Sequence, residues 1–414
     1  MSDLERELTT TQFFADPYPL YDRLRFEVPV YFSERWDCWL LTRYRDADAV
    51  LRDTHLYTNV GRIARFLDTL DEDDRAAAKP LYAHFSAGIN HSDPPDHTRI
   101  RALVHKAFTP RAAEQARDSI QKTVDGLIDA AEPTGRIDLI GDLAYPLPAI
   151  VFAQMFGLPT DERDRFKAWS DQIVAFHGTG RADADVVRRS QEALLAARRW
   201  MAGLVEDRRK QPRDDVLTAL ALAEEQGRGL SETELLSTCI TFMVGGHETT
   251  TNLVGNGMLA LLRHPDQLQR LRENPDLIDG AVEEMLRYDA PTQRAQRLAA
   301  QDHEIDGVLI RRGQRVEPVL GAANRDPERF EEPNRFDITR RKNAHLAFGV
   351  GIHFCVGAAL ARLEGRIAVE TLLRRLPALR LCEDAPIEWH HNSFFRGMMA
   401  LHLTFDSSTA IAGA

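Results

Sequence analysis

The chain has 414 residues, of which 43% are hydrophobic and 28% are charged, and its formal net charge is −11. A chain of this length can bury a large core, whereas its acidic balance argues against nucleic-acid binding, which requires a basic face. Because the sequence contains no linker-like, low-complexity or repeated segment, we expect a single domain over residues 1–414.

The N-terminal residues are polar, so we expect neither a signal peptide nor a membrane anchor. The most apolar long segment, near residues 240–262, carries His247, Glu248 and Asn252 in its middle, which indicates a buried helix and not a membrane span. The cysteines are widely spaced and form no CxxC pair, as is typical of reduced thiols in a cytoplasmic protein. They are Cys38, Cys239, Cys355 and Cys382.

Helical periodicity dominates the chain, and strand patterns are short and few. Helices are predicted over residues 18–26, 47–53, 97–108, 111–131, 162–176, 184–210, 216–225, 232–263, 265–273, 277–288 and 356–376. Strands are predicted over residues 29–32, 38–42, 296–299, 303–305, 308–310 and 315–318, and the pair 303–310 has the Asp-Gly turn of a hairpin. The expected fold class is mainly α with a small β-sheet region.

The predicted helix over 97–108 follows the segment Asp93-Pro94-Pro95. His97 and Arg101 stand four residues apart near its start, so both side chains share one face. For a lone histidine in such a place, a helix-capping or surface role is the ordinary explanation.

The longest predicted helix, 232–263, begins at a capping box with Ser231 at the N-cap and Glu234 three residues on. It ends before His264-Pro265, because proline disfavours helical backbone in the residue before it. A helix of about 32 residues at ~1.5 Å per residue is roughly 48 Å long and must cross the whole domain.

Gly245 and Gly246 lie in the middle of this helix, and each costs about 1 kcal/mol relative to alanine. Close approach to a flat ligand explains such a pair, and so does a kink that admits a small molecule. Glu248 and Thr249 follow at once. On the helix alone, a packing site with Glu248 in a structural salt bridge explains the pattern equally well.

Glu284 and Arg287 stand three residues apart on the predicted helix 277–288, a pair that is usually a solvated surface contact. Arg297 follows on a predicted strand. Further along, Arg335 belongs to the stretch Pro333-Asn334-Arg335-Phe336.

Cys355 stands behind a glycine-punctuated turn, Phe348-Gly349-Val350-Gly351-Ile352-His353-Phe354, and is followed by Val356-Gly357 and a predicted helix. The glycines allow a tight turn and close approach to a flat partner. The N–H groups and dipole at the helix start favour a thiolate, the ligand through which sulfur binds haem iron. A lone cysteine is usually a small buried hydrophobe, but that reading explains neither the glycines nor the helix start.

These stretches resemble the signatures of the cytochrome P450 family. Residues 348–357 match Phe-Gly-x-Gly-x-x-x-Cys-x-Gly at every fixed position, and residues 93–101 are similar to Asp-Pro-Pro-x-His-x-x-x-Arg. Residues 245–249 are similar to Ala/Gly-Gly-x-Asp/Glu-Thr, and residues 284–287 to Glu-x-x-Arg. The resemblance covers roughly residues 93–366 and implies a single-domain P450 fold, with haem between the long central helix and the cysteine loop and helix.

The resemblance implies haem b (iron protoporphyrin IX) as the cofactor, with Cys355 as the axial iron ligand. Its propionates need cations, and arginine matches a carboxylate bidentately. The cofactor-binding residues implied are His97, Arg101, Gly246, Arg297, Phe348, Gly349, His353 and Gly357, besides Cys355.

The resemblance makes Glu248 the acid of a proton relay and Thr249 its hydroxyl, because splitting dioxygen needs protons delivered by positioned groups. It also makes Glu284, Arg287 and Arg335 a buried charge network that locks the cysteine loop.

By position in the family, the substrate pocket is lined by segments 57–90 and 174–177 and by Met243, Thr292, Gln293, Arg294, Phe394 and Phe395. Phe394 and Phe395 favour a hydrophobic substrate, although both serve equally well as core residues. Arg294 is a candidate anchor for an acidic substrate group, and a surface position is its ordinary alternative.

Between residues 335 and 366, six Lys/Arg stand against two Asp/Glu, a local net charge of +4. This basic face predicts docking of an acidic ferredoxin with turnover that falls as salt rises, and a solvated charged face is the plainer explanation. The basic residues are Arg335, Arg340, Arg341, Lys342, Arg362 and Arg366, and the acids are Asp337 and Glu364.

We therefore expect a haem-thiolate monooxygenase of the soluble bacterial type. It would insert one oxygen atom of dioxygen into a hydrophobic small molecule, with electrons from NAD(P)H through a reductase and a ferredoxin. The alternatives are a haem-thiolate sensor or binding protein that does not oxygenate, which would need no proton relay, and a helical scaffold without haem.

Overall fold

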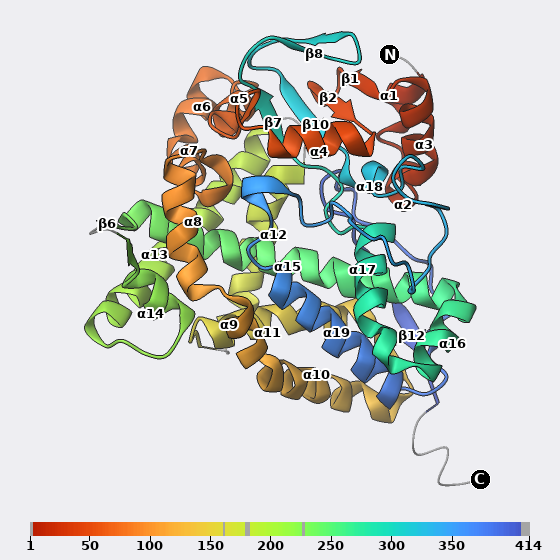
Figure 1. Cartoon of the computed structure of the whole chain (residues 1–414). Coiled ribbons are helices and arrows are strands. Elements are labelled where there is room, and N and C mark those ends of the chain that lie inside the picture. The colour runs from red at the N-terminus through yellow and green to blue at the C-terminus, as the bar shows by residue number, and fades with distance from the viewer. Residues whose placement is uncertain (1–2, 160–161, 179–182, 226–227, 407–414) are drawn as a thin grey trace, which may run out of the picture.

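The central helix α15 (Glu232–Arg263) runs through the middle of the molecule, and the other elements are arranged around it (Figure 1). The computed structural model describes residues 3–159, 162–178, 183–225 and 228–406. The predicted capping box is confirmed, because the Glu234 N–H donates to Ser231 Oγ and the Ser231 N–H donates to Glu234 Oε2. In the described part of the chain, no helix is long and apolar enough to cross a bilayer.

Helices make up most of the described chain, so the predicted fold class is confirmed. Besides α15, the α-helices are α1 (Asp3–Glu7), α2 (Thr11–Ala15), α3 (Tyr18–Glu27), α4 (Tyr44–Arg52), α5 (Arg62–Leu67), α6 (Glu72–Ala77), α7 (Lys79–Ser86), α8 (Asp96–Ala107), α9 (Pro110–Gln115), α10 (Arg117–Ala131), α11 (Pro146–Met155), α12 (Arg163–Gly178), α13 (Ala184–Lys210), α14 (Val216–Ala221), α16 (Pro265–Glu273), α17 (Ile278–Tyr288), α18 (Leu320–Ala323) and α19 (Ala358–Arg375).

The strands are short and form small sheets. A five-stranded sheet has the order β1-β2-β10-β7-β3, in which only the β10–β2 pair is parallel. The strands are β1 (Val30–Ser33), β2 (Cys38–Leu41), β3 (Tyr57–Thr58), β4 (Arg136–Asp138), β5 (Glu224–Glu225), β6 (Arg228–Gly229), β7 (Arg297–Ala299), β8 (His303–Ile305), β9 (Val308–Ile310), β10 (Arg315–Pro318), β11 (Arg380–Leu381) and β12 (His402–Thr404). The predicted hairpin is the antiparallel pair β8–β9, with Asp306 and Gly307 at positive φ in its turn.

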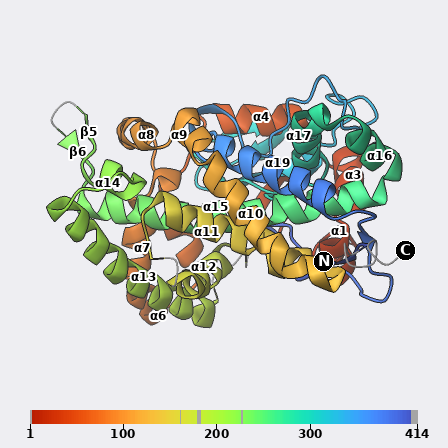
Figure 2. The same cartoon turned by 90° about the horizontal axis from the view of Figure 1, so that it is seen from below.

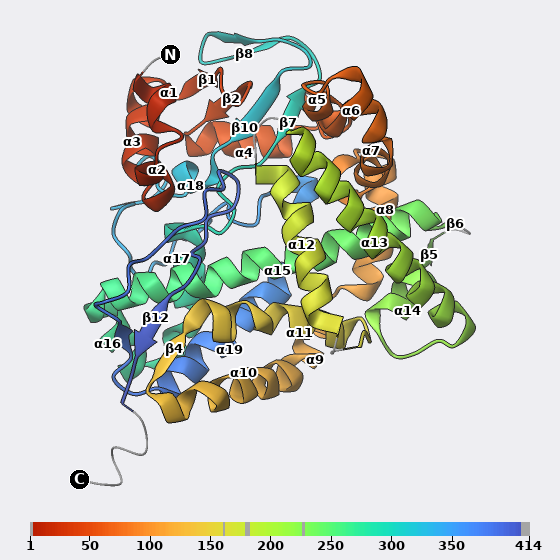
Figure 3. The same cartoon turned by 180° about the vertical axis from the view of Figure 1, so that it is seen from behind.

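Two hydrophobic clusters bury opposite ends of α15. One contains Leu235–Met243 of the N-terminal half with α7, α8, α12 and α13, and the other contains Leu253–Leu261 with α10, α17 and α19. Helix α19 lies along one side of α15 (Figure 1), and α12 and α13 cross the other (Figure 3). Between the clusters, Gly245 and Gly246 are exposed, and no side chain covers the helix there. We call these two residues the bare stretch of α15.

Two predicted helices are wrong at one end or in the middle. The helix predicted over 111–131 is interrupted at Ala116, which separates α9 from α10. The helix predicted over 216–225 ends at Ala221, after which Glu224–Glu225 pairs with Arg228–Gly229. The helices α5, α6, α7 and α11 lie where the sequence predicted no helix.

Candidate functional site

The loop that carries Cys355 is closed by its own backbone, because the Cys355 N–H donates to the Phe348 carbonyl oxygen at 3.0 Å. Gly349 and Gly351 adopt φ of +64° and +76°, which disfavours any residue with a side chain. At Gly351 an added Cβ would also lie 2.9 Å from the Leu51 carbonyl oxygen. The glycines are therefore required by backbone angles and by contact with the end of α4.

The Cys355 thiol is exposed and lies before the first turn of α19. Although the residue is exposed, the neighbouring protein removes water from around the sulfur, and this desolvation raises the pKa of Cys355. The backbone N–H groups of Gly357 and Ala358 and the charges of Arg101 and Arg362 lower it. The helix-start field predicted from the sequence is present, but burial outweighs it for the free thiol. A metal cation at the sulfur would reverse this balance, since coordination deprotonates a thiol.

The bare stretch of α15 has room for a ligand. No protein atom lies within 4 Å of a Cβ added at Gly245 or Gly246, although both stand in the middle of a 32-residue helix. Thr249 lies one turn on and donates its hydroxyl to the Gly245 carbonyl oxygen at 2.7 Å. Burial, followed by the charge of Asp171, raises the pKa of Glu248, so this carboxyl holds its proton more tightly than an exposed one.

The four side chains predicted to bind propionates are brought together. The rings of His97 and His353 lie 4.2 Å apart, and the buried His97 Nε2 has no hydrogen-bond partner in the described part of the chain. Burial, then the charges of His353 and Arg101, lowers the pKa of His97 to about 4. Arg297 also contributes to this shift, which places all four groups in one electrostatic cluster.

The two arginines of this cluster have no acid partner among the described residues. Among the described residues no carboxylate oxygen lies within 4.0 Å of the Arg101 or Arg297 guanidinium, and burial lowers the pKa of both. Asp93 lies 3.9 Å from His353 Nε2, but it already accepts hydrogen bonds from Thr58 and Asn59. An anionic ligand would supply the missing negative charge, so the cations, the bare glycines and the exposed thiol together fit haem.

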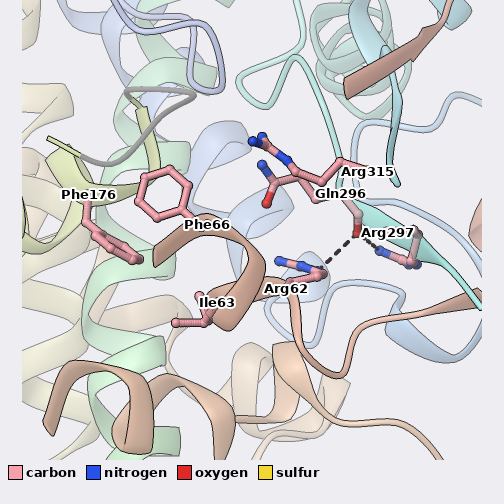
Figure 4. Close-up of a pocket in the computed structure, with 7 residues that line it drawn as sticks. All are labelled: Arg62, Ile63, Phe66, Phe176, Gln296, Arg297 and Arg315. Atoms are coloured by element: carbon pink, nitrogen blue, oxygen red, sulfur yellow. Dashed lines mark hydrogen bonds between the residues drawn. The ribbon is translucent and has the colours of Figure 1, made fainter. Parts of the chain in front are cut away.

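Arg62 is a member of this region that the sequence reasoning missed. It begins α5 and donates to the Gln296 carbonyl oxygen at 3.1 Å, beside Arg297, which donates to the same oxygen at 2.8 Å (Figure 4). No motif marks Arg62, and its neighbourhood arises only when α5 packs against β7. Its signal is structural: a half-buried arginine whose Nε is buried without a partner and which has no acid partner among the described residues.

The predicted charge network requires one correction. Glu284 and Arg287 are fully buried and form a bidentate pair at 2.8 Å, but the second arginine on Glu284 is Arg340, at 3.2 Å, and not Arg335. The Arg335 side chain is 56% exposed and pairs with Glu332 at 2.9 Å. Only the Arg335 backbone takes part, because its carbonyl oxygen accepts from Arg287 and from Arg340.

The network is joined to the segment before the cysteine loop by Asn324, and also by Asn343, whose amide donates to Glu284 Oε2 at 3.2 Å. Arg287 donates to the Asn324 carbonyl oxygen at 2.9 Å, and Asn324 Oδ1 accepts from the Leu346 N–H at 2.7 Å. Leu346 stands two residues before Phe348. The buried charges thus fix the backbone that leads into the loop.

The predicted pocket residues fall into two groups. Met243 and Phe394 are buried among core side chains, whereas Thr292 and Phe395 are half-buried and face each other across a β-bridge. The side chains of residues 174 and 177 lie outside the described part of the chain. Thr292 and Phe395 therefore remain candidates for contact with a substrate.

Arg294 is neither a surface residue nor a free anchor, so both predictions for it are wrong. It is 1% exposed, pairs with Glu317 of β10 at 2.8 Å and donates to the Ser393 carbonyl oxygen. Its guanidinium also stacks on Trp36, 4.0 Å from the ring centroid. Gln293 is buried beside it and donates to the Ala290 carbonyl oxygen.

The predicted basic face is largely neutralised by acids from α17 and from its own loop. Arg362 pairs with Glu283, Arg366 with Asp279, Arg340 with Glu284 and Arg335 with Glu332. The two remaining cations, Arg341 and Lys342, are exposed and have no carboxylate within 4.0 Å in the described part of the chain.

Known proteins match nearly the whole chain. A family model described as Cytochrome P450 matches residues 53–388. Cytochrome P450 monooxygenase PikC of Streptomyces venezuelae is 43% identical over 401 residues, which are 94% of this chain and 91% of that protein. The Biotin biosynthesis cytochrome P450 of Bacillus subtilis is 38% identical and covers 96% of this chain and 98% of its own length.

Solved structures agree with this match. P450BioI in complex with hexadec-9Z-enoic acid ligated acyl carrier protein has a TM-score of 0.88 at 37% identity, covering 96% of this chain and 99% of that one. The myxobacterial cytochrome P450 CYP267B1 in complex with myristic acid has a TM-score of 0.87 at 40% identity, covering 97% and 99%.

Proposed function

Because the chain belongs to the cytochrome P450 family of monooxygenases, we propose that it hydroxylates or epoxidises a hydrophobic small organic molecule. In this reaction one oxygen atom of dioxygen enters the substrate, and the other leaves as water with two electrons from NAD(P)H and two protons. The observation that carries the proposal is Cys355, an exposed thiol on a glycine-restrained loop at the start of α19.

The cofactor in this proposal is haem b, with Cys355 as its iron ligand. When bound, it supplies the centre at which dioxygen is activated. His97, Arg101, Arg297 and His353 would hold its propionates, since they lie in one cluster whose two arginines have no carboxylate within 4.0 Å among the described residues. Gly246 would leave space above the ring, and Phe348, Gly349 and Gly357 would shape the loop below it.

Glu248 and Thr249 are the proposed proton-delivering pair. Because the pKa of Glu248 is raised, this half-buried carboxyl holds its proton more tightly than an exposed glutamate and can serve as a proton donor. The Thr249 hydroxyl, which now donates to the Gly245 carbonyl oxygen, is held at the bare stretch of α15. A protein that only sensed ligands would have no need of this pair.

The electron donor is proposed to be a ferredoxin served by an NAD(P)H-dependent reductase, with Arg341 and Lys342 at its docking face. The four cysteines are all free thiols, which suits the cytoplasm. One relative is named for biotin biosynthesis, and one similar structure was solved in complex with an acyl carrier protein that carries a fatty acid. These similarities favour a substrate from bacterial biosynthesis, and fatty acids are the first compounds to test.

The proposal is tested first by the visible spectrum of the reduced, carbon-monoxide-treated protein. Wild type should show a haem-thiolate spectrum, and Cys355→Ala should lose it while keeping its helical circular dichroism. Colourless, folded wild-type protein supplied with haem would refute the proposal.

A second experiment separates an enzyme from a sensor. With a surrogate ferredoxin and labelled dioxygen, wild type should form labelled product, and Glu248→Gln should lower product formed per NAD(P)H consumed about tenfold or more. Unlabelled or absent product with full haem binding, across a fatty-acid and small-molecule library, would favour the non-oxygenating alternative.

A further inference from the structure

A small cavity of about 20 Å³ lies between α5, α12 and the sheet, lined by Arg62, Ile63, Phe66, Phe176, Gln296, Arg297 and Arg315 (Figure 4). Its apolar wall is formed largely by Phe66 and Phe176, whose ring centroids lie 4.9 Å apart in an edge-to-face arrangement. A space of this size admits about one water molecule or one oxygen of a larger group.

The cationic wall of the cavity has an unsatisfied donor. The Arg62 guanidinium donates through Nη1 to Asn59 Oδ1 at 2.6 Å and to the Gln296 carbonyl oxygen at 3.1 Å. Its buried Nε has no hydrogen-bond partner in the described part of the chain. A buried N–H without an acceptor is unfavourable, so an acceptor is expected there when the site is filled.

The same wall carries excess positive charge. Burial, then repulsion by Arg297, lowers the pKa of Arg62 to about 9, and burial lowers that of Arg297 to about 10. Within the described residues neither guanidinium has a carboxylate oxygen within 4.0 Å. The nearest acids are engaged elsewhere, since Glu317 pairs with Arg294 and Arg315, and Asp93 accepts from Thr58 and Asn59.

We propose that Arg62, acting with Arg297, binds a carboxylate at this cavity. This contact would connect the first residue of α5 to a ligand of the proposed haem site. The inference rests on the proposed haem enzyme, which offers two sources of a carboxylate: a haem propionate and the acid group of a substrate. Arginine is the residue type suited to this role because its planar fork matches a carboxylate.

The test uses the haem-loaded protein, wild type and three variants. Arg62→Ala removes the cation, and Arg62→Gln keeps an amide for the Asn59 contact if the alanine variant fails to fold. Arg65→Ala is the matched control, because Arg65 lies on the same helix but pairs with Asp37 and is 36% exposed. Haem loss to excess apomyoglobin is timed, and myristic acid and methyl myristate are titrated by calorimetry.

A haem propionate as the partner predicts that the Arg62 variants lose haem about ten- to a hundredfold faster than wild type, with Arg65→Ala unchanged. A substrate acid as the partner predicts unchanged haem loss and about tenfold weaker binding of myristic acid, but not of its ester. Either result supports a carboxylate site at Arg62. Haem loss and acid binding that match wild type in both Arg62 variants would overturn it.

Failure of this inference is distinguishable from failure of the proposed function. If wild type holds haem through Cys355 and only the Arg62 variants are without effect, the carboxylate site alone is refuted. If wild type binds no haem, the proposed function fails, and the calorimetric comparison of acid and ester still decides whether Arg62 recognises a carboxylate.

Discussion

Glu364 is a buried acid that the proposed chemistry does not use. It lies on α19, is 2% exposed, and its Oε2 has no hydrogen-bond partner among the described residues. Burial alone raises its pKa from 4.5 to about 8. At pH 7 this side chain is therefore mostly protonated in the folded protein.

A pH-dependent stability follows from this shift. Between pH 4.5 and 8 the unfolded chain releases the Glu364 proton while the folded chain keeps it, so the carboxyl lowers the free energy of unfolding as pH rises. Glu364→Gln should remove this loss and gain stability over wild type with rising pH, by up to about 4 kcal/mol at pH 8. Thermal unfolding at several pH values measures the difference, with exposed Glu331→Gln as the control for a lost surface charge. A constant difference between pH 5 and 8 would contradict the assignment.

The correction at Arg335 leads to a second prediction at the scale of single residues. Arg340→Ala removes two charge-assisted contacts to the buried Glu284, although Arg287 and the Asp337 N–H still hold that carboxylate. We expect a loss of about 2–3 kcal/mol in the free energy of unfolding. Arg335→Ala removes only an exposed pair and should change it by less than about 0.5 kcal/mol.

Denaturant unfolding of the two variants side by side gives the comparison. Both are arginine-to-alanine changes five residues apart, so they serve as controls for each other. Equal losses, or a larger loss for Arg335→Ala, would restore the network predicted from the sequence.

At the scale of the elements, the glycines of α15 fall into two kinds: some are packed into the hydrophobic core, and others face the open site. At Gly257 an added Cβ would lie 2.5 Å from Met285 Sδ, whereas at Gly246 it would meet no protein atom within 4 Å. Gly257 is thus required by helix packing. Gly246 has no such reason in the protein and needs one from a ligand.

This contrast gives a prediction for Gly246→Leu. Without a ligand over the glycine, leucine should stabilise the helix by about 0.8 kcal/mol through propensity alone. With haem over it, leucine should perturb the visible spectrum and lower haem content per folded protein several-fold, at unchanged helical circular dichroism. Gly126→Leu is the control, because Gly126 lies on α10 with equally open surroundings. A Gly246→Leu protein with wild-type haem content and spectrum would place the ligand elsewhere.

The elements predicted correctly are those with strong local signals. The helices α13, α15 and α16 begin and end as predicted, because caps, prolines and periodicity agree there. Helix α11 was missed since its sequence, PLPAIVFAQM, is apolar all round and shows no amphipathic period. The short helices α5 and α6 have six residues each, too few for a periodic pattern.

The site was predictable in residue type but not in side-chain direction. Motif spacing indicated Cys355, the glycine pair and the residues of the cationic cluster, and tertiary packing brings the cluster together and places Arg101 near Cys355. It did not distinguish Arg335 from Arg340, because which of them faces Glu284 depends on how their loop folds over α17. Nor did it indicate Arg62 or the partner of Arg294, since both contacts join segments more than 20 residues apart along the chain.

At the scale of the whole molecule, the two hydrophobic clusters are linked by one continuous helix (Figure 2). Neither cluster can detach without breaking α15, which supports the proposal of one domain. The bare stretch lies where the clusters meet, so the site is held rigid from both ends while its surface stays open. Burial at the two ends of α15 offsets the cost of the two glycines in its middle.

The charge of the surface near the cysteine loop sets the last prediction. Because four of its six cations are paired with acids, Arg341 and Lys342 carry the local excess charge. Steering by two exposed charges is modest and screened by salt. We therefore expect turnover with ferredoxin to fall gradually as ionic strength rises, more weakly than the count of +4 implied.

The double variant Arg341→Glu/Lys342→Glu should raise the KM for ferredoxin about three- to tenfold at low salt and flatten the salt dependence. Substrate binding and the haem spectrum should not change, because neither residue belongs to the site. The control is the double variant Arg188→Glu/Arg189→Glu on α13, which reverses the charge of two exposed arginines. Helices α13 and α19 lie on opposite sides of α15 (Figure 2). Because the control makes the same change of charge at another place, an equal effect of both changes would mean that overall charge, and not this face, governs docking. No effect of either would place the electron donor on another surface.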